Sequence, residues 1–355
     1  MIPVAGSDSQ ELVLQLAWQV SAALAVLVVL LVIQILVSGL RLDLRHRRIE
    51  RLRETWEPIL ADAAGDPGIA LPALARRDLI PFLHLWSYVQ QILLDEACLN
   101  LNVVARRAGA ADGARRALHS PRLRDRLIAI TALGHLRDEE AWPELEILAA
   151  SPDPVPSLTA ARSLFRIDPG RAAERLIPEI PRRLDWSLAG LAGILAEAGP
   201  DAVSEPLAEA ARSAPAAHLP RLIRLLQLAH GAVAIHAVRR IIATTTDTEV
   251  ITACLRVFED PEDLGTVRTL LADERWQVRL HAAGALGRMG TEEDEPRLIR
   301  ALEDPEWWVR YRAAQALAGL PSMAGDRLRQ LSRELPGRFA RDILRQVMAE
   351  RELAC

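Results

Sequence analysis

A 31-residue repeat constrains the fold of this chain more than any other feature of its sequence. When residues 273–290 are placed over residues 304–320, Trp276 falls on Trp307 and most of the apolar positions coincide. This spacing indicates seven repeats between about residues 120 and 336, because self-similarity at a period of 20–50 residues is typical of repeat architectures. With one step of 29 residues, the spacing joins seven leucines: Leu133, Leu164, Leu195, Leu226, Leu255, Leu286 and Leu317.

Each repeat predicts a pair of helices. A dipeptide such as Asp304-Pro305 supplies an N-cap and a first-turn proline, and an apolar stripe at helical spacing follows. One pair cannot bury its stripe alone, so the pairs must stack into an all-α solenoid. The acidic run at residues 292–295 falls in the turn between two helices, where we expect it to be solvated and to favour the helix dipole. The stripe of the last repeat consists of Val309, Ala313, Ala316 and Leu317.

The pattern Asp-x-x-Trp-x-Val-Arg-x-x-Ala-Ala-x-Ala-Leu-Gly is matched almost fully at residues 273–287 and 304–318. This pattern resembles the HEAT repeats, in the short form also seen in phycobilin lyases. The resemblance covers roughly residues 120–335 and is weak between about residues 182 and 260. The repeat subtype suggests a lyase-like HEAT protein acting on a bilin as an alternative function.

The resemblance also implies an ion-pair ladder. In HEAT families an aspartate and the arginine six residues later form ladders between neighbouring repeats, and Asp273 with Arg279 and Asp304 with Arg310 resemble that pair. Ser157 replaces the arginine in the second repeat, and the middle repeats have no such pair. The ladder is therefore expected only toward the C-terminus.

An uncharged apolar run lies near the N-terminus, from Ala17 to Val37. Its 21 residues are long enough for the hydrocarbon core of a bilayer, so we predict a transmembrane helix at residues 17–40 after a short non-cytoplasmic segment, residues 1–16. The positive-inside rule then predicts a single-pass protein of the cytoplasmic (inner) membrane, with its C-terminal domain in the cytoplasm. The basic flank consists of Arg41, Arg45, Arg47, Arg48, Arg51 and Arg53.

The remaining boundaries follow from composition and pattern. Residues 41–77 are predicted as a basic juxtamembrane helix and a linker rich in Gly and Pro. Residues 78–119 are predicted as a helical N-terminal cap, residues 120–336 as the HEAT-like repeats and residues 337–355 as a C-terminal cap helix.

Composition excludes several classes of chemistry. All 43 basic residues are arginine, which excludes a phosphate loop ending in Gly-Lys and a Schiff-base lysine. The three cysteines and eight histidines lack the spacing of a disulfide framework, a zinc knuckle or a helical metal site. A net charge of -4 argues against nucleic acid as the main partner. We therefore expect no enzyme activity, cofactor, metal or small-molecule substrate.

With these kinds of chemistry excluded, the extended surface of a repeat protein is what could carry a function. We therefore expect a membrane-anchored scaffold that binds another membrane or membrane-proximal protein. Aromatic side chains and arginine dominate the centres of protein interfaces. For Trp308 and Tyr311, the alternative role is packing against the C-terminal cap helix. A bilin lyase and a nucleic-acid-binding helical-repeat protein are the alternative functions. The candidate partner-binding residues are Trp308, Tyr311, Arg312 and Gln315, opposite the apolar stripe of their helix.

Overall fold

The structure is a computed structural model that describes residues 7–93, 95–323 and 325–354. Its described residues form helices and turns and contain no strand. The chain divides into two compact units, Met1–Leu136 (unit 1) and Arg137–Cys355 (unit 2). The boundary lies inside the first predicted repeat, whose first helix belongs to unit 1.

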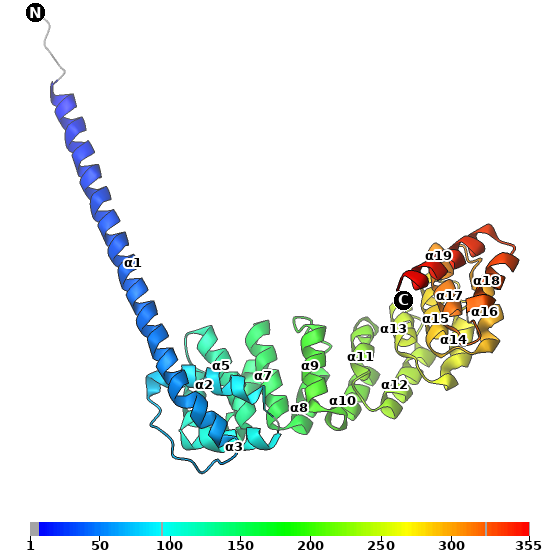
Figure 1. Ribbon diagram of the computed structural model, residues 1–355, viewed down its shortest axis with the longest axis horizontal. Coiled ribbons are helices and arrows are strands. Elements are labelled where there is room, and N and C mark those ends of the chain that lie inside the picture. Colours follow the sequence, from blue (N-terminus) through cyan, green and yellow to red (C-terminus); the bar gives the residue numbers. More distant parts are fainter. Residues whose placement is uncertain (1–6, 94, 324, 355) are drawn as a thin grey trace, which may run out of the picture. The chain divides into compact units, whose positions relative to one another are not determined.

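The long first helix of unit 1 packs its C-terminal part on the helices that follow (Figure 1). Leu52, Trp56, Leu60 and Ala63 form a buried stripe at helical spacing, and the ring of Trp56 meets the ring of Phe82 edge-on at 4.6 Å. The helix ends at Ala63, ahead of the Gly- and Pro-rich segment. The elements of unit 1 are α1 (Ser7–Ala63), the 3₁₀ turn η1 (Arg76–Asp78), α2 (Leu79–Gln90), α3 (Asp95–Arg107), α4 (Ala110–Ala117) and α5 (Leu123–Leu136).

The prediction of a membrane anchor is corrected by the structure. No helix in the described part of the chain is long and apolar enough to cross a membrane. The predicted transmembrane helix at residues 17–40 and the predicted single-pass location in the inner membrane are therefore wrong.

Unit 2 is a stack of helix pairs. Figure 1 shows α7, α9, α11 and α13 side by side; α15 packs against both α13 and α17, and α17 packs against α19. The predicted all-α repeat solenoid is confirmed in this unit. Its α-helices are α6 (Trp142–Ala149), α7 (Pro154–Ile167), α8 (Pro169–Leu176), α9 (Leu188–Ala198), α10 (Pro200–Ser213), α11 (Leu219–Leu226), α12 (Gly231–Thr244), α13 (Thr248–Val257), α14 (Leu264–Leu270), α15 (Trp276–Met289), α16 (Glu295–Ala301), α17 (Trp307–Gly319), α18 (Gly325–Glu334) and α19 (Arg338–Ala354).

The side chains at the repeat spacing form the core. All seven leucines from Leu133 to Leu317 are at most 1% exposed, so the repeat frame read from the sequence is confirmed. Small residues let the helices approach closely. A Cβ added at Gly287 of α15 would lie 3.0 Å from the Cα of Ala316 in α17. Larger side chains at this contact would force the two helices apart.

The last helix continues the repeat register. α19 begins 31 residues after α17, and Arg341 donates to the carbonyls of Leu335 and Pro336. Arg310 donates in the same way to the carbonyls of Asp304 and Pro305 at the start of its own repeat. The segment predicted as the C-terminal cap helix therefore lies in the register of the repeats.

Candidate functional site

The predicted ladder joins one pair of neighbouring repeats. Arg279 donates from Nε and Nη2 to the two carboxylate oxygens of Asp304, at 2.7 and 2.9 Å. Asp273 instead accepts from Arg275 of its own repeat, and this hydrogen bond lowers the pKa of the Asp273 carboxyl. Among the described residues, Arg310 pairs with no aspartate of the next repeat, because Leu335 stands 31 residues after Asp304.

A second ladder, which the sequence analysis missed, joins arginines of α12 and α14 to aspartates in the 3₁₀ turns Pro261–Asp263 and Glu292–Asp294. Arg268 of α14 binds both carboxylate oxygens of Asp294 at 2.6 and 3.0 Å, and Arg239 of α12 binds Asp263 at 2.6 Å. Asp294 is fully buried, so the expectation of a solvated acidic run is wrong at this residue. Burial alone would raise the pKa of Asp294, but the hydrogen bonds from Arg268 and from the backbone N–H of Thr291 outweigh it and lower that pKa.

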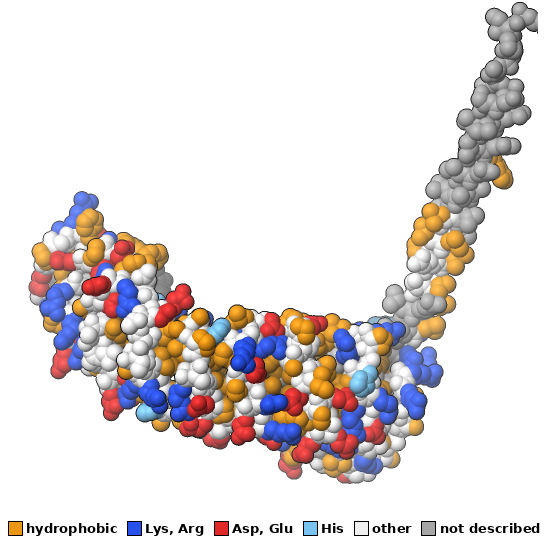
Figure 2. Space-filling model, turned by 180° about the vertical axis from the view of Figure 1, so that it is seen from behind, with side chains coloured by type: hydrophobic (Ala, Val, Ile, Leu, Met, Phe, Trp, Pro, Cys, Tyr) orange, Lys and Arg blue, Asp and Glu red, His pale blue; other side chains and the backbone are white. Residues whose placement is uncertain are grey.

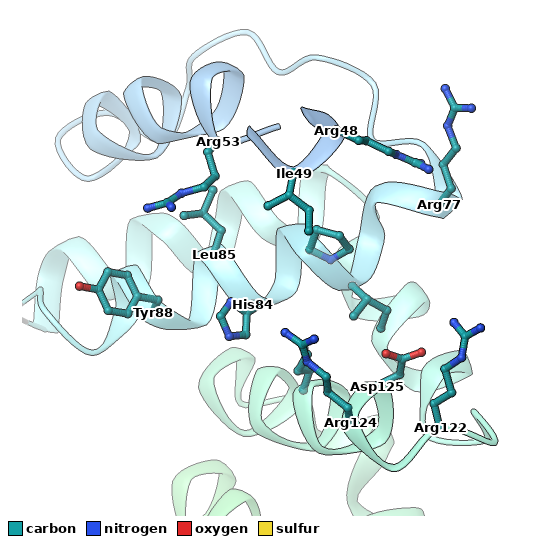
Figure 3. A pocket seen from close by; sticks show the side chains of 13 residues that line it. Arg48, Ile49, Arg53, Arg77, His84, Leu85, Tyr88, Arg122, Arg124 and Asp125 are labelled. Atoms are coloured by element: carbon teal, nitrogen blue, oxygen red, sulfur yellow. The ribbon is translucent and has the colours of Figure 1, made fainter. Parts of the chain in front are cut away.

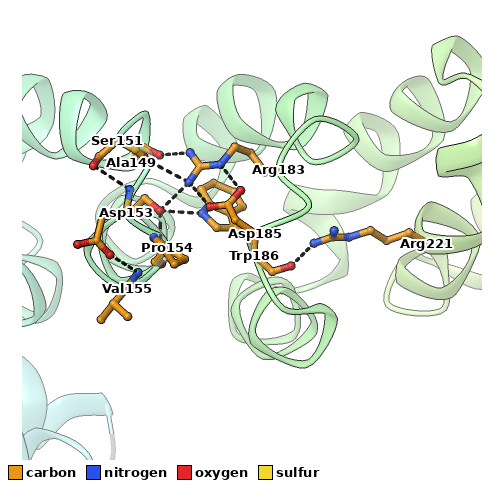
Figure 4. Close-up of polar contacts among 10 residues, drawn as sticks. Ala149, Ser151, Asp153, Pro154, Val155, Arg183, Asp185, Trp186 and Arg221 are labelled. Atoms are coloured by element: carbon orange, nitrogen blue, oxygen red, sulfur yellow. Dashed lines mark hydrogen bonds and ion pairs between the residues drawn. The ribbon is translucent and has the colours of Figure 1, made fainter.

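Where the ladder is interrupted, an arginine from the following repeat takes its place. Arg183 donates to the carbonyls of Ala149 and Ser151 at 2.6 and 3.0 Å and to the hydroxyl of Ser157 at 2.6 Å (Figure 4). Trp186 donates its indole N–H to the same hydroxyl at 2.9 Å. Ser157 therefore anchors the neighbouring repeat, although it cannot form the ion pair of the family pattern.

These hydrogen bonds and ion pairs between neighbouring repeats explain why arginine suits the surface of unit 2. The guanidinium group presents several donors in a planar fork, so one side chain binds carbonyls and carboxylates of an adjacent repeat together. Figure 2 shows arginine and acidic side chains interspersed over one face of the molecule.

An exposed aromatic cluster lies at the C-terminal end of unit 2. We call Trp307, Trp308, Tyr311 and Phe339 the aromatic surface; Trp307, Trp308 and Phe339 are 40%, 56% and 72% exposed. Trp307 stacks on Tyr311 at a centroid distance of 5.1 Å and meets Trp308 edge-on at 4.7 Å. Trp308 and Phe339 occupy the same position in successive repeats, at the start of α17 and α19. Phe339 was missed because its repeat was read as a cap.

The four predicted partner-binding residues share this end of α17. Tyr311 is half-buried and donates its hydroxyl to Glu350 of α19 at 2.6 Å, which raises the pKa of Tyr311. Arg312 donates to the side-chain oxygen of Gln315 at 3.0 Å. Tyr311 thus packs against the last helix, as the alternative reading expected, while Trp308 stays exposed.

Unit 1 contains a pocket of about 650 Å³ that the sequence analysis did not anticipate. Arg48 and Arg53, two members of the predicted basic flank, line it together with residues of η1, α2 and α5 (Figure 3). Arg47 instead pairs with Asp43 at 2.9 Å, and Arg51 is exposed. The side chains of Arg41 and Arg45 lie outside the described residues. The lining residues of α1, η1, α2 and α5 are too far apart in the sequence for any motif spacing to predict that they form one pocket.

The described residues contain no group of three or more His, Cys, Asp or Glu side chains placed to hold a metal ion. Cys254 is buried, and burial raises the pKa of its thiol to about 12. This thiol is therefore protonated at neutral pH and is poorly suited to nucleophilic chemistry.

Comparison with known proteins supports the repeat assignment. The family described as HEAT repeats matches residues 219–318 and 264–349, which extend from α11 into α19. The crystal structure of an engineered protein is similar over 85% of this chain and 98% of that chain, at 16% identity and a TM-score of 0.33. A score this low does not establish a shared architecture. No curated protein matches the chain. Residues 219–349 of this chain are therefore similar to the HEAT-repeat family.

Proposed function

We propose that the protein is a non-catalytic HEAT-repeat scaffold that binds a protein partner through the aromatic surface. One observation carries the proposal. Trp307, Trp308 and Phe339 are exposed together at one end of unit 2, whereas most other described aromatic side chains, such as Trp186 and Phe258, are buried. Large exposed aromatic groups at neighbouring positions are typical of the centres of protein interfaces.

The chemistry of the surface defines its partner. The guanidinium of Arg310 lies 5.6 Å from the ring centre of Phe339, and Arg312 bonds to a neutral amide rather than to a carboxylate among the described residues. A guanidinium without a carboxylate partner is free to bind one from another chain. The partner is therefore a protein segment that presents apolar side chains beside an acidic one.

The double variant Trp308→Ala with Phe339→Ala tests the proposal. Both side chains are more than half exposed, so their removal should leave the melting temperature nearly unchanged. Native complexes are purified from the source cells and quantified by mass spectrometry, and a specific partner should be depleted about tenfold or more in the double variant. Leu184→Ala, at another exposed apolar position, is the matched control and should keep the partner.

Two results would contradict the proposal. Equal recovery of all co-purified proteins from wild type and the double variant would show that the aromatic surface is not a binding site. A lower melting temperature in the double variant, with unchanged recovery, would assign these side chains to the packing of α17 against α19.

A further inference from the structure

The pocket of unit 1 combines an apolar floor with a basic rim. Ile49 of α1, Ile80, Pro81 and Leu85 of α2, and Ile128 of α5 provide apolar lining. The exposed ring of Tyr88 stands toward one end (Figure 3). Ligand sites typically have such a largely apolar lining with a few convergent polar groups, and volumes of about 300–1,000 Å³.

Five arginines from three segments converge on this pocket: Arg48, Arg53, Arg77, Arg122 and Arg124. Figure 3 shows the arginines of α1 and η1 across the pocket from Arg124 of α5 and from Arg122, which directly precedes α5. Like charges repel when they are brought together, so this convergence costs free energy unless an anion joins them.

The carboxylates nearby neutralise only part of this charge. Asp78 pairs with Arg48 at 2.6 Å, and Glu57 pairs with Arg53 at 2.9 Å. Asp125 is the third carboxylate at the pocket. Five arginines less these three carboxylates leave a net charge of +2.

The structure also leaves guanidinium donors unused. Within the described part of the chain, no carboxylate pairs with Arg77, Arg122 or Arg124. The guanidinium groups of Arg77, Arg122 and Arg124 can therefore donate to an anion in the pocket.

We propose that this pocket binds an organic phosphate monoester, with its phosphate between the arginines and its apolar or aromatic body on the floor beside Tyr88. A phosphate monoester carries a charge of about -1.5 to -2 at pH 7, which balances the net charge of the pocket. Arginine binds phosphate oxygens through parallel N–H donors. The side chains of Ile49 and Leu85 would contact the apolar part of the ligand. The site lies within unit 1 and is separate from the aromatic surface.

Isothermal titration calorimetry of the full chain with 1-naphthyl phosphate tests this site. Two comparison ligands separate its parts. Inorganic phosphate carries the negative charge but has no aromatic ring, and 1-naphthol has the aromatic ring but no negative charge. We expect 1-naphthyl phosphate to bind at least about tenfold more tightly than either, because it alone contacts both the arginines and the floor. Binding should weaken as the salt concentration rises.

The double variant Arg77→Gln with Arg122→Gln should weaken binding of 1-naphthyl phosphate by about tenfold or more. Both side chains are exposed, so the fold should be retained, which circular dichroism checks. Arg76→Gln is the matched control, because Arg76 lies on the same turn and does not line the pocket; its affinity should equal that of the wild type.

Three results would overturn the proposal. The first is no saturable binding of 1-naphthyl phosphate. The second is equal affinity for inorganic phosphate or 1-naphthol, which would show that charge and floor do not act together. The third is an equal loss in Arg76→Gln and in the double variant, which would indicate general attraction to a basic surface.

Discussion

Replacing Arg268 with alanine tests whether the buried ladder holds neighbouring repeats together. The change removes two hydrogen bonds to the fully buried carboxylate of Asp294, of 2.6 and 3.0 Å. Hydrogen bonds to charged groups contribute about 1.5–3 kcal/mol each, and breaking a buried ion pair costs about 3–5 kcal/mol. The side chain of Arg268 is 24% exposed, so we expect the lower end, about 3 kcal/mol.

Urea denaturation followed by far-UV circular dichroism measures this loss, and hydrogen exchange of α14 to α16 locates it. Arg182→Ala is the control. Arg182 pairs with Glu179 at 3.3 Å, but the two side chains are 78% and 50% exposed, so its loss should cost less than about 1 kcal/mol. Equal costs for Arg268→Ala and Arg182→Ala would refute the reasoning.

The pH dependence of the same pair has a definite sign. Because the folded pKa of Asp294 lies below its ordinary value of 3.8, the stabilisation is present above pH 3.8 and is lost as the pH falls through the folded pKa. In Arg268→Ala, burial is no longer opposed by the guanidinium, so the loss should begin at a higher pH. Identical acid denaturation of the two proteins would contradict this assignment.

Three further predictions concern Leu286, Cys254 and His281 of unit 2. Leu286→Ala should lower the free energy of unfolding by about 2 to 5 kcal/mol in urea, because Leu286 is fully buried; a loss below about 1 kcal/mol would contradict the repeat frame. Cys254 should resist alkylation at pH 8 in the folded protein and react in urea, measured by mass spectrometry, since its pKa of about 12 leaves little thiolate; rapid native labelling would contradict its burial. Burial, and then the nearby Arg256, lower the pKa of His281 from 6.5 to about 4, so stability should fall as the pH decreases through this interval. His281→Gln should flatten that dependence in urea titrations at several pH values, and an unchanged slope would disprove it.

The repeat frame could be predicted because burial repeats with the sequence. Leucine at a fixed spacing, such as Leu286 and Leu317, reports the core of a stacked helix pair directly. The register of α19 was missed because Leu335 and Pro336 replace the Asp-Pro that marks the repeat start at Asp304. Arg341 of α19 donates to the backbone carbonyls of Leu335 and Pro336, and these hydrogen bonds do not need an aspartate at the repeat start.

The buried polar contacts were harder to predict, because a charged residue in a sequence is normally expected to be exposed to solvent. Asp294 looks like a solvated turn residue in the sequence, and only the position of Arg268 shows why it is buried. The pocket of unit 1 depends on α1, η1 and α5, whose lining residues are separated by tens of positions. Local pattern carries no information on such convergence, and the apolar run at residues 17–37 suggested a membrane span that the described structure does not support.

Site-specific photo-crosslinking tests the central claim, that the aromatic surface binds a protein. A benzophenone amino acid replaces Phe339, which is 72% exposed, or Leu184, which is 67% exposed, in the full chain expressed in the source cells. After irradiation, Phe339 should give one discrete crosslinked protein that is absent from the Leu184 position and lost when Trp308→Ala is added. The same crosslinked species from both positions, or none from Phe339, would contradict the account.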